Sequence, residues 1–279
     1  MILVKNTSDL KGFLQKSQGP ISFVPTMGAL HRGHLALMET ARKHSSTTVC
    51  SIFVNPTQFN DPKDFAKYPI TLEKDIELLE HSGTDILFLP SVSTLYPLVT
   101  SNLENYELGY LETVLEGSSR PGHFQGVCQV MFRLLTAVGP VKLFMGQKDY
   151  QQCMVVKRLL EITRLPAMLY TCDTVRESDG LAMSSRNKRL SSQERQNATA
   201  ISKALNYAKE HLGKQSLQEI RTTATEILES SQFKIDYIEF ADAGTLELRE
   251  NWDGQQSLVL LIAAFHGEVR LIDNMILHH

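Results

Sequence analysis

The sequence predicts an α/β fold in which a mostly parallel sheet is followed by a smaller domain of mixed α and β structure. Two observations lead to this prediction. Before residue 186, short apolar runs alternate with amphipathic segments, which is the order of βαβ units. After Arg186, two helical patterns are followed by strand patterns alone. A chain of 279 residues is long enough to bury a core in each of two such domains.

The alternating part is assigned element by element from the period of its apolar residues. A short apolar run bounded by turn residues indicates a buried strand, and apolar residues three and four apart indicate a helix. The expected strands cover residues 21–24, 48–54, 86–89, 141–145 and 169–175. The expected helices cover residues 35–44, 72–81, 126–137 and 150–162. In a parallel sheet of this kind, ligands gather beyond the carboxyl ends of the strands.

The change of pattern places a domain boundary within residues 175–189, a stretch with a glycine and several serines. We therefore expect a sheet domain over residues 1–177 and a smaller domain over residues 178–279. Ser191 and Glu194 have the spacing of a helix-capping box, which marks the start of a long helix. The smaller domain is expected to contain helices up to Leu212 and over 216–229, strands over 234–240, 257–265 and 268–276, and a two-residue hairpin at His266-Gly267.

Composition and charge exclude several classes of protein. The formal net charge is −3, so we expect no nucleic-acid partner. The longest apolar run, 258–265, is far too short to cross a bilayer, and the first residues lack a signal-peptide pattern. The cysteines show neither a CxxC pair nor tight spacing, so we expect reduced, mostly buried thiols in a cytoplasmic protein without membrane attachment. They are Cys50, Cys128, Cys153 and Cys172. No function is assigned to His278 or His279.

The strongest functional signal is the tetrapeptide His31-Arg32-Gly33-His34, which lies between an expected strand and an expected helix. The first N–H groups of a helix are unpaired and the peptide dipoles place partial positive charge there, so such sites bind anions and above all phosphates. His31 and His34 would share one face of the first turn, within reach of one phosphate group. The alternatives are a zinc site, which would need a third ligand, and a ligand-free tight turn over residues 27–30.

An amide-bearing loop follows the next expected strand. Pro56 forces the chain out of that strand and leaves Asn55 and Gln58 on a loop at its carboxyl end. Amide side chains both donate and accept hydrogen bonds, so they can bind a polar organic substrate in a fixed pattern. An ordinary Asn-Pro turn with an exposed glutamine is the alternative interpretation.

Two cationic segments complete the set of candidates. Lys148 follows an expected strand and can neutralise charge that develops on phosphates, and Asp149 suits a ribose hydroxyl. Ser184, Ser185 and Arg186 offer hydroxyl donors and a planar guanidinium, which together can clamp a phosphate. Taken alone, Lys148 is read as a solvated surface charge, and for the second segment a Ser-rich linker is an equal alternative. Their occurrence together with the anion-binding turn favours a nucleotide site.

Five segments, taken together and in order, carry a family resemblance. They read PTMGALHRGH at 25–34, FVNPTQF at 53–59, RPGHFQGV at 120–127, GQKDYQQ at 146–152 and DGLAMSSRN at 179–187. The HxGH tetrapeptide alone belongs to a wide superfamily of nucleotidyltransferases and class I aminoacyl-tRNA synthetases. The complete set resembles the pantothenate synthetases (pantoate–β-alanine ligases) across nearly the whole chain, although the C-terminal third matches in layout more than in motif.

The resemblance implies an α/β fold with a Rossmann-like parallel-sheet domain and a smaller α+β C-terminal domain that acts as a lid. It also implies a homodimer and a Mg²⁺-dependent reaction of ATP, (R)-pantoate and β-alanine. In the first step the pantoate carboxylate attacks the α-phosphorus of ATP and releases pyrophosphate. In the second step the amine of β-alanine displaces AMP from pantoyl adenylate to give pantothenate. Because no protein nucleophile is involved, much of the rate should come from positioning and charge stabilisation.

Roles for single residues follow from the resemblance by matching position. His34 would donate a proton, and His31 and Lys148 would bind the phosphates as further catalytic groups. Gln58 and Gln152 would bind pantoate, and Gln58 would also contact β-alanine. The residues that would bind ATP, with Asp149 at the ribose and Val175 at the adenine, are Pro25, Thr26, Met27, Gly28, Ala29, Leu30, His31, Arg32, Gly33, His34, Gly146, Gln147, Lys148, Asp149, Val175, Met183, Ser184, Ser185 and Arg186.

The chain departs from the family pattern at a few positions, none of which has a role above. They are Ile70, Val141, Met145 and Asp173. Two other functions remain as alternatives. A nucleotidylyltransferase that keeps the adenylyl group in its product would not depend on β-alanine, and a nucleotide-sensing module would bind ATP without turnover. The presence of both histidines disfavours the sensing module.

Overall fold

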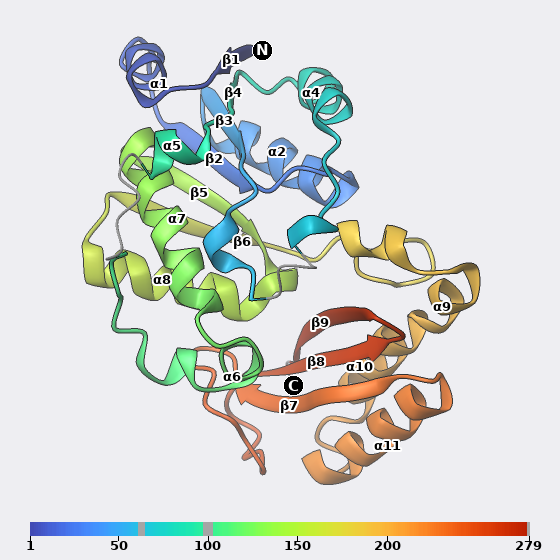
Figure 1. Cartoon of the computed structure of the whole chain (residues 1–279). Helices are drawn as coiled ribbons and strands as arrows, with labels where there is room; N and C mark the ends of the chain where they lie inside the picture. The colour runs from blue at the N-terminus through green and yellow to red at the C-terminus, as the bar shows by residue number, and fades with distance from the viewer. Residues whose placement is uncertain (61–64, 97–102, 278–279) are drawn as a thin grey trace. The chain divides into compact units, whose positions relative to one another are not determined.

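The structure is a computed structural model in which residues 1–60, 65–96 and 103–277 are described (Figure 1). The chain forms two compact units. Unit 1 consists of Met1–Gly146 and Gln151–Asp173, and unit 2 consists of Gln147–Tyr150 and Thr174–His279. His278 and His279 lie outside the described residues. The domain limits expected from the sequence, 1–177 and 178–279, stay a prediction.

Unit 1 is built on a six-stranded parallel sheet. Its strands are β1 (Ile2–Val4), β2 (Ile21–Thr26), β3 (Thr47–Ile52), β4 (Ile86–Phe88), β5 (Val141–Gly146) and β6 (Ala167–Cys172). They are arranged in the order β1-β4-β3-β2-β5-β6. β2 pairs with β3 on one side and with β5 on the other, so the direction of strand succession reverses at β2. Open α/β sheets bind their ligands at such a reversal, beyond the carboxyl ends of the strands.

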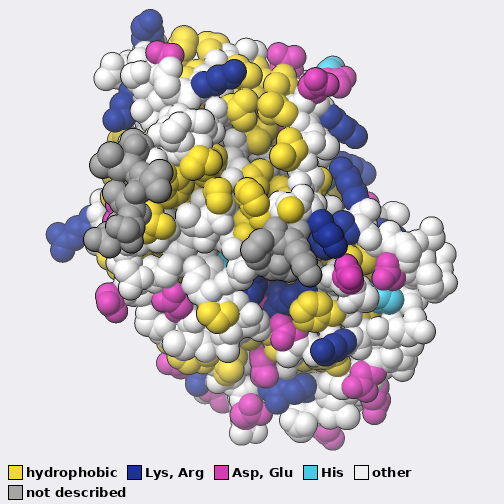
Figure 2. Space-filling model, in the orientation of Figure 1, with side chains coloured by type: hydrophobic (Ala, Val, Ile, Leu, Met, Phe, Trp, Pro, Cys, Tyr) yellow, Lys and Arg dark blue, Asp and Glu magenta, His cyan; other side chains and the backbone are white. Residues whose placement is uncertain are grey.

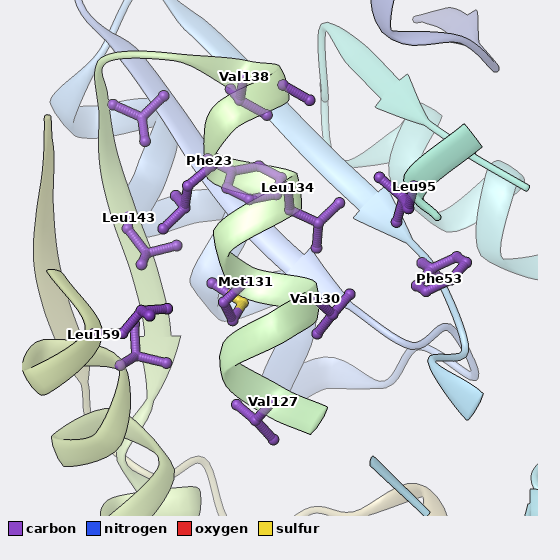
Figure 3. Packing of buried hydrophobic residues seen from close by; sticks show 14 of the residues in the cluster. Phe23, Phe53, Leu95, Val127, Val130, Met131, Leu134, Val138, Leu143 and Leu159 are labelled. Atoms are coloured by element: carbon purple, nitrogen blue, oxygen red, sulfur yellow. The ribbon is translucent and has the colours of Figure 1, made fainter. Parts of the chain in front are cut away.

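Helices cover both faces of this sheet. The helices and 3-10 turns up to β6 are α1 (Thr7–Leu14), α2 (Arg32–His44), η1 (Pro56–Gln58), α4 (Leu72–His81), α5 (Val92–Leu95), η2 (Gly109–Glu112), α6 (Leu115–Ser119), α7 (His123–Val138), η3 (Gln147–Asp149) and α8 (Tyr150–Thr163). Neighbouring strand residues point to opposite faces. Phe23 and Leu143 therefore pack with α1, α7 and α8, while Val24 and Phe144 pack with α2 and α4. Figure 3 shows the first layer, in which Met131 of α7 lies among Phe23, Leu143 and Leu159.

Unit 2 contains a three-stranded antiparallel sheet with its own core. Its strands are β7 (Lys234–Asp242), β8 (Leu258–His266) and β9 (Val269–Leu277), and its further helices are η4 (Ser185–Arg189), α9 (Ser192–Asn197), α10 (Thr199–His211) and α11 (Leu217–Ser230). β8 is the central strand. Leu205 of α10 and Ile220 of α11 share a core with Leu260 and Ile262 of β8. Together the two sheets confirm the predicted combination of a parallel α/β domain and a smaller α+β domain.

In unit 1 one expected strand needs correction, and two further elements are present. The strand expected over 169–175 ends at Cys172, because Val175 leaves the sheet and its carbonyl accepts the N–H of Met183 at 3.0 Å. β1 and α1 were not predicted, because the short apolar run of β1 is followed at once by the polar first turn of α1. Asn6 caps that helix by accepting the N–H of Asp9 at 2.8 Å.

Two expectations for unit 2 are wrong in detail. The long helix expected up to Leu212 is interrupted at Ala198, where the N–H of Ile201 bonds to the carbonyl three residues back at 3.3 Å. The hairpin residues are Gly267 and Glu268 rather than His266-Gly267, because His266 still pairs with Val269. Gly267 has a φ of +57°, a conformation that favours glycine.

The surface and the cysteines agree with the composition of the chain. Figure 2 shows acidic and basic side chains interspersed over one face. Within the described ranges, no helix is both long and apolar enough to cross a membrane. Three of the four cysteines are buried and Cys172 is partly buried. Burial raises the pKa of Cys50 and of Cys128 to about 12, which keeps both thiols protonated.

Candidate functional site

The two histidines of the HxGH tetrapeptide lie together at the start of α2. His31 is the N-cap residue with an extended backbone, and α2 begins at the next residue rather than at Leu35 as expected. His34 Nδ1 accepts the backbone N–H of His31 at 3.2 Å, and the two ring centroids are 4.0 Å apart. Because Nδ1 is an acceptor, the neutral ring of His34 holds its proton on Nε2. The Nε2–H group of His34 can therefore donate a hydrogen bond to a ligand.

The turn that leads into this helix is held by a buried carboxylate that the sequence did not single out. Gly28 and Ala29 both have left-handed backbones, with φ of +80° and +50°. Asp75 of α4 accepts the N–H of Ala29 at 2.9 Å and that of Leu30 at 2.8 Å, one on each oxygen. Its side chain is 1% exposed. A carboxylate that accepts two backbone N–H groups fixes their directions strongly.

The amide loop after β3 is buried and contacts the same turn. Asn55 is 1% exposed, and its Nδ2 donates to the carbonyl of Gly126 at 3.0 Å and to Gln58 Oε1 at 3.3 Å. Gln58 Nε2 lies 3.0 Å from the sulfur of Met27. The alternative of an ordinary turn with an exposed glutamine is therefore wrong. Asn55 and Gln58 form a buried, hydrogen-bonded amide pair that contacts the turn before His31.

The RPGHF part of the segment at 120–127 contacts the backbone of Gln58. His123, the first residue of α7, is buried, and its Nδ1 lies 2.7 Å from the carbonyl oxygen of Gln58. Arg120 Nη1 lies 3.1 Å from His123 Nε2, so Nε2 accepts and Nδ1–H donates to Gln58. A Cβ on Gly126 would lie 2.3 Å from the carbonyl oxygen of Thr57, so α7 can approach the loop this closely only with glycine there.

The cationic candidates belong to unit 2. Lys148 Nζ lies 3.5 Å from Asp149 Oδ1, and the lysine side chain is 18% exposed. Ser184 caps η4 by accepting the N–H of Arg186 at 3.3 Å, and Ser185 is buried. The alternatives of a fully solvated lysine and a Ser-rich linker do not describe these environments.

The predicted site residues divide between the two units. Within unit 1 the structure brings together the histidine pair, the turn before it and Gln58; Gln152 is partly buried in the first turn of α8. Unit 1 contains Pro25, Thr26, Met27, Gly28, Ala29, Leu30, His31, Arg32, Gly33, His34, Gln58, Gly146 and Gln152. Unit 2 contains Gln147, Lys148, Asp149, Val175, Met183, Ser184, Ser185 and Arg186. Among the described side chains, no group of three or more His, Cys, Asp or Glu is placed to hold a metal ion.

Comparison with known proteins covers the whole chain. The family model described as Pantoate-beta-alanine ligase matches residues 2–276. The pantothenate synthetase of Leptospira biflexa is 43% identical over 283 residues, which covers 99% of each chain. That of Bacteroides thetaiotaomicron is 40% identical and covers 99% of this chain and 98% of its own.

Solved structures give the same result at the level of the fold. The pantothenate synthetase of Thermus thermophilus matches with a TM-score of 0.93 at 39% identity, over 100% of both chains. The pantoate-beta-alanine ligase of Francisella tularensis, a complex with beta-gamma ATP and β-alanine, matches with a TM-score of 0.83 at 35% identity over 99% of this chain and 97% of its own. The chain described here belongs to the pantoate-beta-alanine ligase family.

Proposed function

We propose that this chain condenses (R)-pantoate with β-alanine at the expense of ATP, forming pantothenate, AMP and pyrophosphate through a pantoyl adenylate. The observation that supports it most directly is the histidine pair at the start of α2, with Gln58 against the turn before it. An N-terminal helix turn with two imidazoles suits phosphates, and a buried amide beside it suits a hydroxy acid. Both sites are needed by a reaction that joins a carboxylate to a nucleotide.

The first step transfers an adenylyl group to pantoate. A carboxylate oxygen of pantoate attacks the α-phosphorus, the bond from this phosphorus to the bridging oxygen breaks, and pyrophosphate leaves. His34 Nε2–H would donate to the phosphate oxygens as their charge increases, together with His31 and the N-terminal dipole of α2. Lys148 would neutralise the phosphates as a further cation.

The second step forms the amide. A free carboxylate is a poor acyl donor because its leaving group would be oxide, and the adenylate replaces that oxide with AMP. The amine nitrogen of β-alanine attacks the acyl carbon, AMP departs with the bridging oxygen, and the nitrogen loses a proton. Gln58 and Gln152 would hold pantoate in both steps, and Gln58 would also contact β-alanine. Its carbonyl is held by His123 and its Nε2 lies against Met27, which restricts both ends of the residue.

The nucleotide contacts are part of the same proposal. Asp149 would bind the ribose and Val175 the adenine. The turn over 25–34 and the segments 146–149 and 183–186 would bind the phosphates. Mg²⁺ would accompany the ATP phosphates, since it takes substrate phosphates, waters and one or two carboxylates in preference to a dedicated protein cage. When bound, the ion neutralises phosphate charge, and the part of this chain is to hold the phosphates in place.

We also propose that the chain forms a homodimer and is located in the cytoplasm. The family resemblance implies a homodimer. The four cysteines are all free thiols, which suits the reducing conditions of the cytoplasm.

Omission of single substrates tests the proposed reaction. The purified chain should form AMP and pantothenate in equal amounts from ATP, Mg²⁺, pantoate and β-alanine, and neither product should accumulate when pantoate is left out. Turnover that is indifferent to β-alanine would instead support the nucleotidylyltransferase alternative. Binding of ATP with no turnover in the complete mixture would support the sensing module.

A further inference from the structure

Asn274, near the C-terminal end of the chain, holds the backbone of the Lys148 segment. Its Nδ2 donates to the carbonyl oxygen of Gln147 at 2.9 Å and to that of Lys148 at 2.8 Å. Its Oδ1 accepts from Gln147 Nε2 at 3.3 Å. Asn274 lies on β9, is 2% exposed and belongs to the same unit as this segment. Both hydrogens of one buried amide are thus used on consecutive carbonyl groups of η3.

An ion pair between the buried Asp273 and the partly buried Arg176 fixes Asn274 in turn. Asp273 is 4% exposed, and its oxygens accept Arg176 Nη1 at 2.6 Å and Nη2 at 3.1 Å. Its Oδ1 also accepts the backbone N–H of Asn274 at 2.8 Å. This bidentate arrangement is the strong form of a carboxylate–guanidinium contact. The ion pair therefore fixes the backbone position of Asn274, from which its side chain extends to η3.

The same arginine reaches the segment that leads to the serine pair. Arg176 Nη1 donates to the carbonyl of Gly180 at 3.1 Å. Arg176 and Ala182 form an antiparallel bridge, and the N–H of Met183 bonds to the carbonyl of Val175 at 3.0 Å. One cluster on β9 thus bonds directly to η3 and, through Arg176, to the hairpin that ends at Met183. η3 and the residues that directly follow this hairpin, 183–186, are the parts of unit 2 to which phosphate contacts are assigned above.

The short length of η3 explains why it would need this support. It is a single 3-10 turn of three residues, Gln147–Asp149, and a single turn has few hydrogen bonds of its own. Two of its carbonyl groups accept hydrogen bonds from Asn274, and loss of that buried amide would remove both bonds. A backbone shift of one ångström at Lys148 would move Nζ away from a phosphate, and errors of that size cost large factors in rate.

We propose that Asn274 is a positioning residue for Lys148, with the Asp273–Arg176 pair as its anchor. The inference rests on the proposed function, in which Lys148 binds the ATP phosphates. Asn274 is not expected to contact substrate. Its removal should therefore act only through Lys148 and should affect the use of ATP more than the use of pantoate or β-alanine.

A double-mutant cycle on Asn274 and Lys148 tests this. We expect Asn274→Ala to lower kcat/KM for ATP by about tenfold to a hundredfold, with a much smaller change in KM for pantoate. Asn274→Asp should be at least as severe. A carboxylate oxygen would stand in place of Nδ2 and would face the two carbonyl oxygens to which Nδ2 donates. In a Lys148→Ala background, Asn274→Ala should have little further effect, since the group that it positions is already absent.

Asn197→Ala is the matched control in the same unit. Asn197 is an asparagine whose Nδ2 lies 3.2 Å from His266 Nε2, and it has no assigned role in the site. It should lower the thermal midpoint without a selective loss of ATP use. If Asn274→Asp fails to fold, Asn274→Ala completes the cycle, because it removes the donors without adding a charge.

The outcomes separate this inference from the function on which it rests. Effects of Asn274→Ala and Lys148→Ala that simply add would overturn the positioning role, as would equal losses for all three substrates. A Lys148→Ala variant with normal use of ATP would instead contradict the phosphate contact in the proposed function.

Discussion

Asp75 accepts the backbone N–H of Ala29 at 2.9 Å, although the two residues are 46 positions apart in the chain. The other oxygen of this carboxylate takes the next N–H, that of Leu30, at 2.8 Å. Ala29 has a left-handed backbone, which costs free energy in a residue with a Cβ. The buried carboxylate stabilises the turn against that cost and so determines how the chain enters His31 and α2.

Asp75→Asn should damage the use of ATP. An amide offers one acceptor oxygen, so one of the two N–H groups would face another donor and stay unpaired, at a cost of about 1–3 kcal/mol in the free energy of unfolding. The turn before His31 would then relax, and we expect KM for ATP to rise by about tenfold or more. Steady-state kinetics with each substrate varied in turn, together with urea unfolding, measure both effects.

Asp85→Asn is the matched control for this variant. Asp85 Oδ2 accepts the N–H of Thr48 at 2.8 Å, but this bond lies at the amino ends of β3 and β4, away from the carboxyl ends where the site lies. It should lower stability while leaving KM for ATP unchanged. An equal rise in KM in both variants would show that Asp75 has no special role in the site.

His34→Ala should lower kcat by about a hundredfold or more, since loss of one preorganised donor at a developing charge has this effect. The fold should survive, because His34 caps the first turn of α2 through the backbone N–H of His31 and is not one of the buried core residues of unit 1. Rapid-quench measurement of AMP formation and a thermal melt check the two statements. Unchanged turnover in a folded variant would refute the assignment of His34.

Gln58→Ala should mainly weaken the use of pantoate and β-alanine. The side chain lies against Met27 and Asn55, so its loss opens the amide pair without touching the histidines. KM for both organic substrates should rise, while the affinity for ATP, measured by calorimetry without the other substrates, should stay close to that of the parent. A selective loss of ATP affinity would overturn this role.

The capping glutamates of α9 and α11 should make the stability of unit 2 sensitive to acid. The backbone N–H of Ser191 donates to Glu194 at 2.7 Å and that of Ser216 to Glu219 at 2.8 Å, and these bonds hold both pKa values below the ordinary value of glutamate. A carboxyl with a lowered pKa in the folded state contributes stability above its unfolded pKa, and that stability is lost as the pH falls through the folded pKa.

The thermal midpoint should therefore fall as the pH is lowered from about 5. It should fall less steeply in the double variant Glu194→Gln, Glu219→Gln, because glutamine keeps the capping geometry without titrating. Calorimetric melts between neutral and acid pH compare the two slopes, and parallel slopes would contradict the prediction.

Local patterns in the sequence were enough to predict most elements of the fold. The period of the apolar residues predicts α4 at its observed limits. Short apolar runs also predict five of the six parallel strands, because successive strand residues such as Phe23 and Val24 are both buried, one on each face of the sheet. The expected start of α2 lies three residues after the observed one at Arg32. Arg32 is charged and Gly33 has no side chain, so the apolar spacing begins only at Leu35. The cap at His31 depends on backbone conformation rather than on periodicity.

The parts of the candidate site that could not be predicted are those that depend on tertiary contact. Asp75 reads in sequence as one of the acids in the first turn of a helix, which a helix dipole favours anyway. Asn274 reads as one polar residue of a strand, and only the fold brings it to the carbonyl groups of Gln147 and Lys148. The contact of His123 with Gln58 could not be predicted from local patterns, because it joins residues 65 positions apart.

The central claim is that pantoate is activated as an acyl adenylate, and its most direct test is the fate of the carboxylate oxygen. Pantoate labelled with ¹⁸O in its carboxylate should be incubated with ATP, Mg²⁺, β-alanine and the purified chain, and the AMP analysed by mass spectrometry. We predict that each AMP formed contains one ¹⁸O atom, because AMP departs with the bridging oxygen. AMP without label, formed together with pantothenate, would contradict the proposed mechanism.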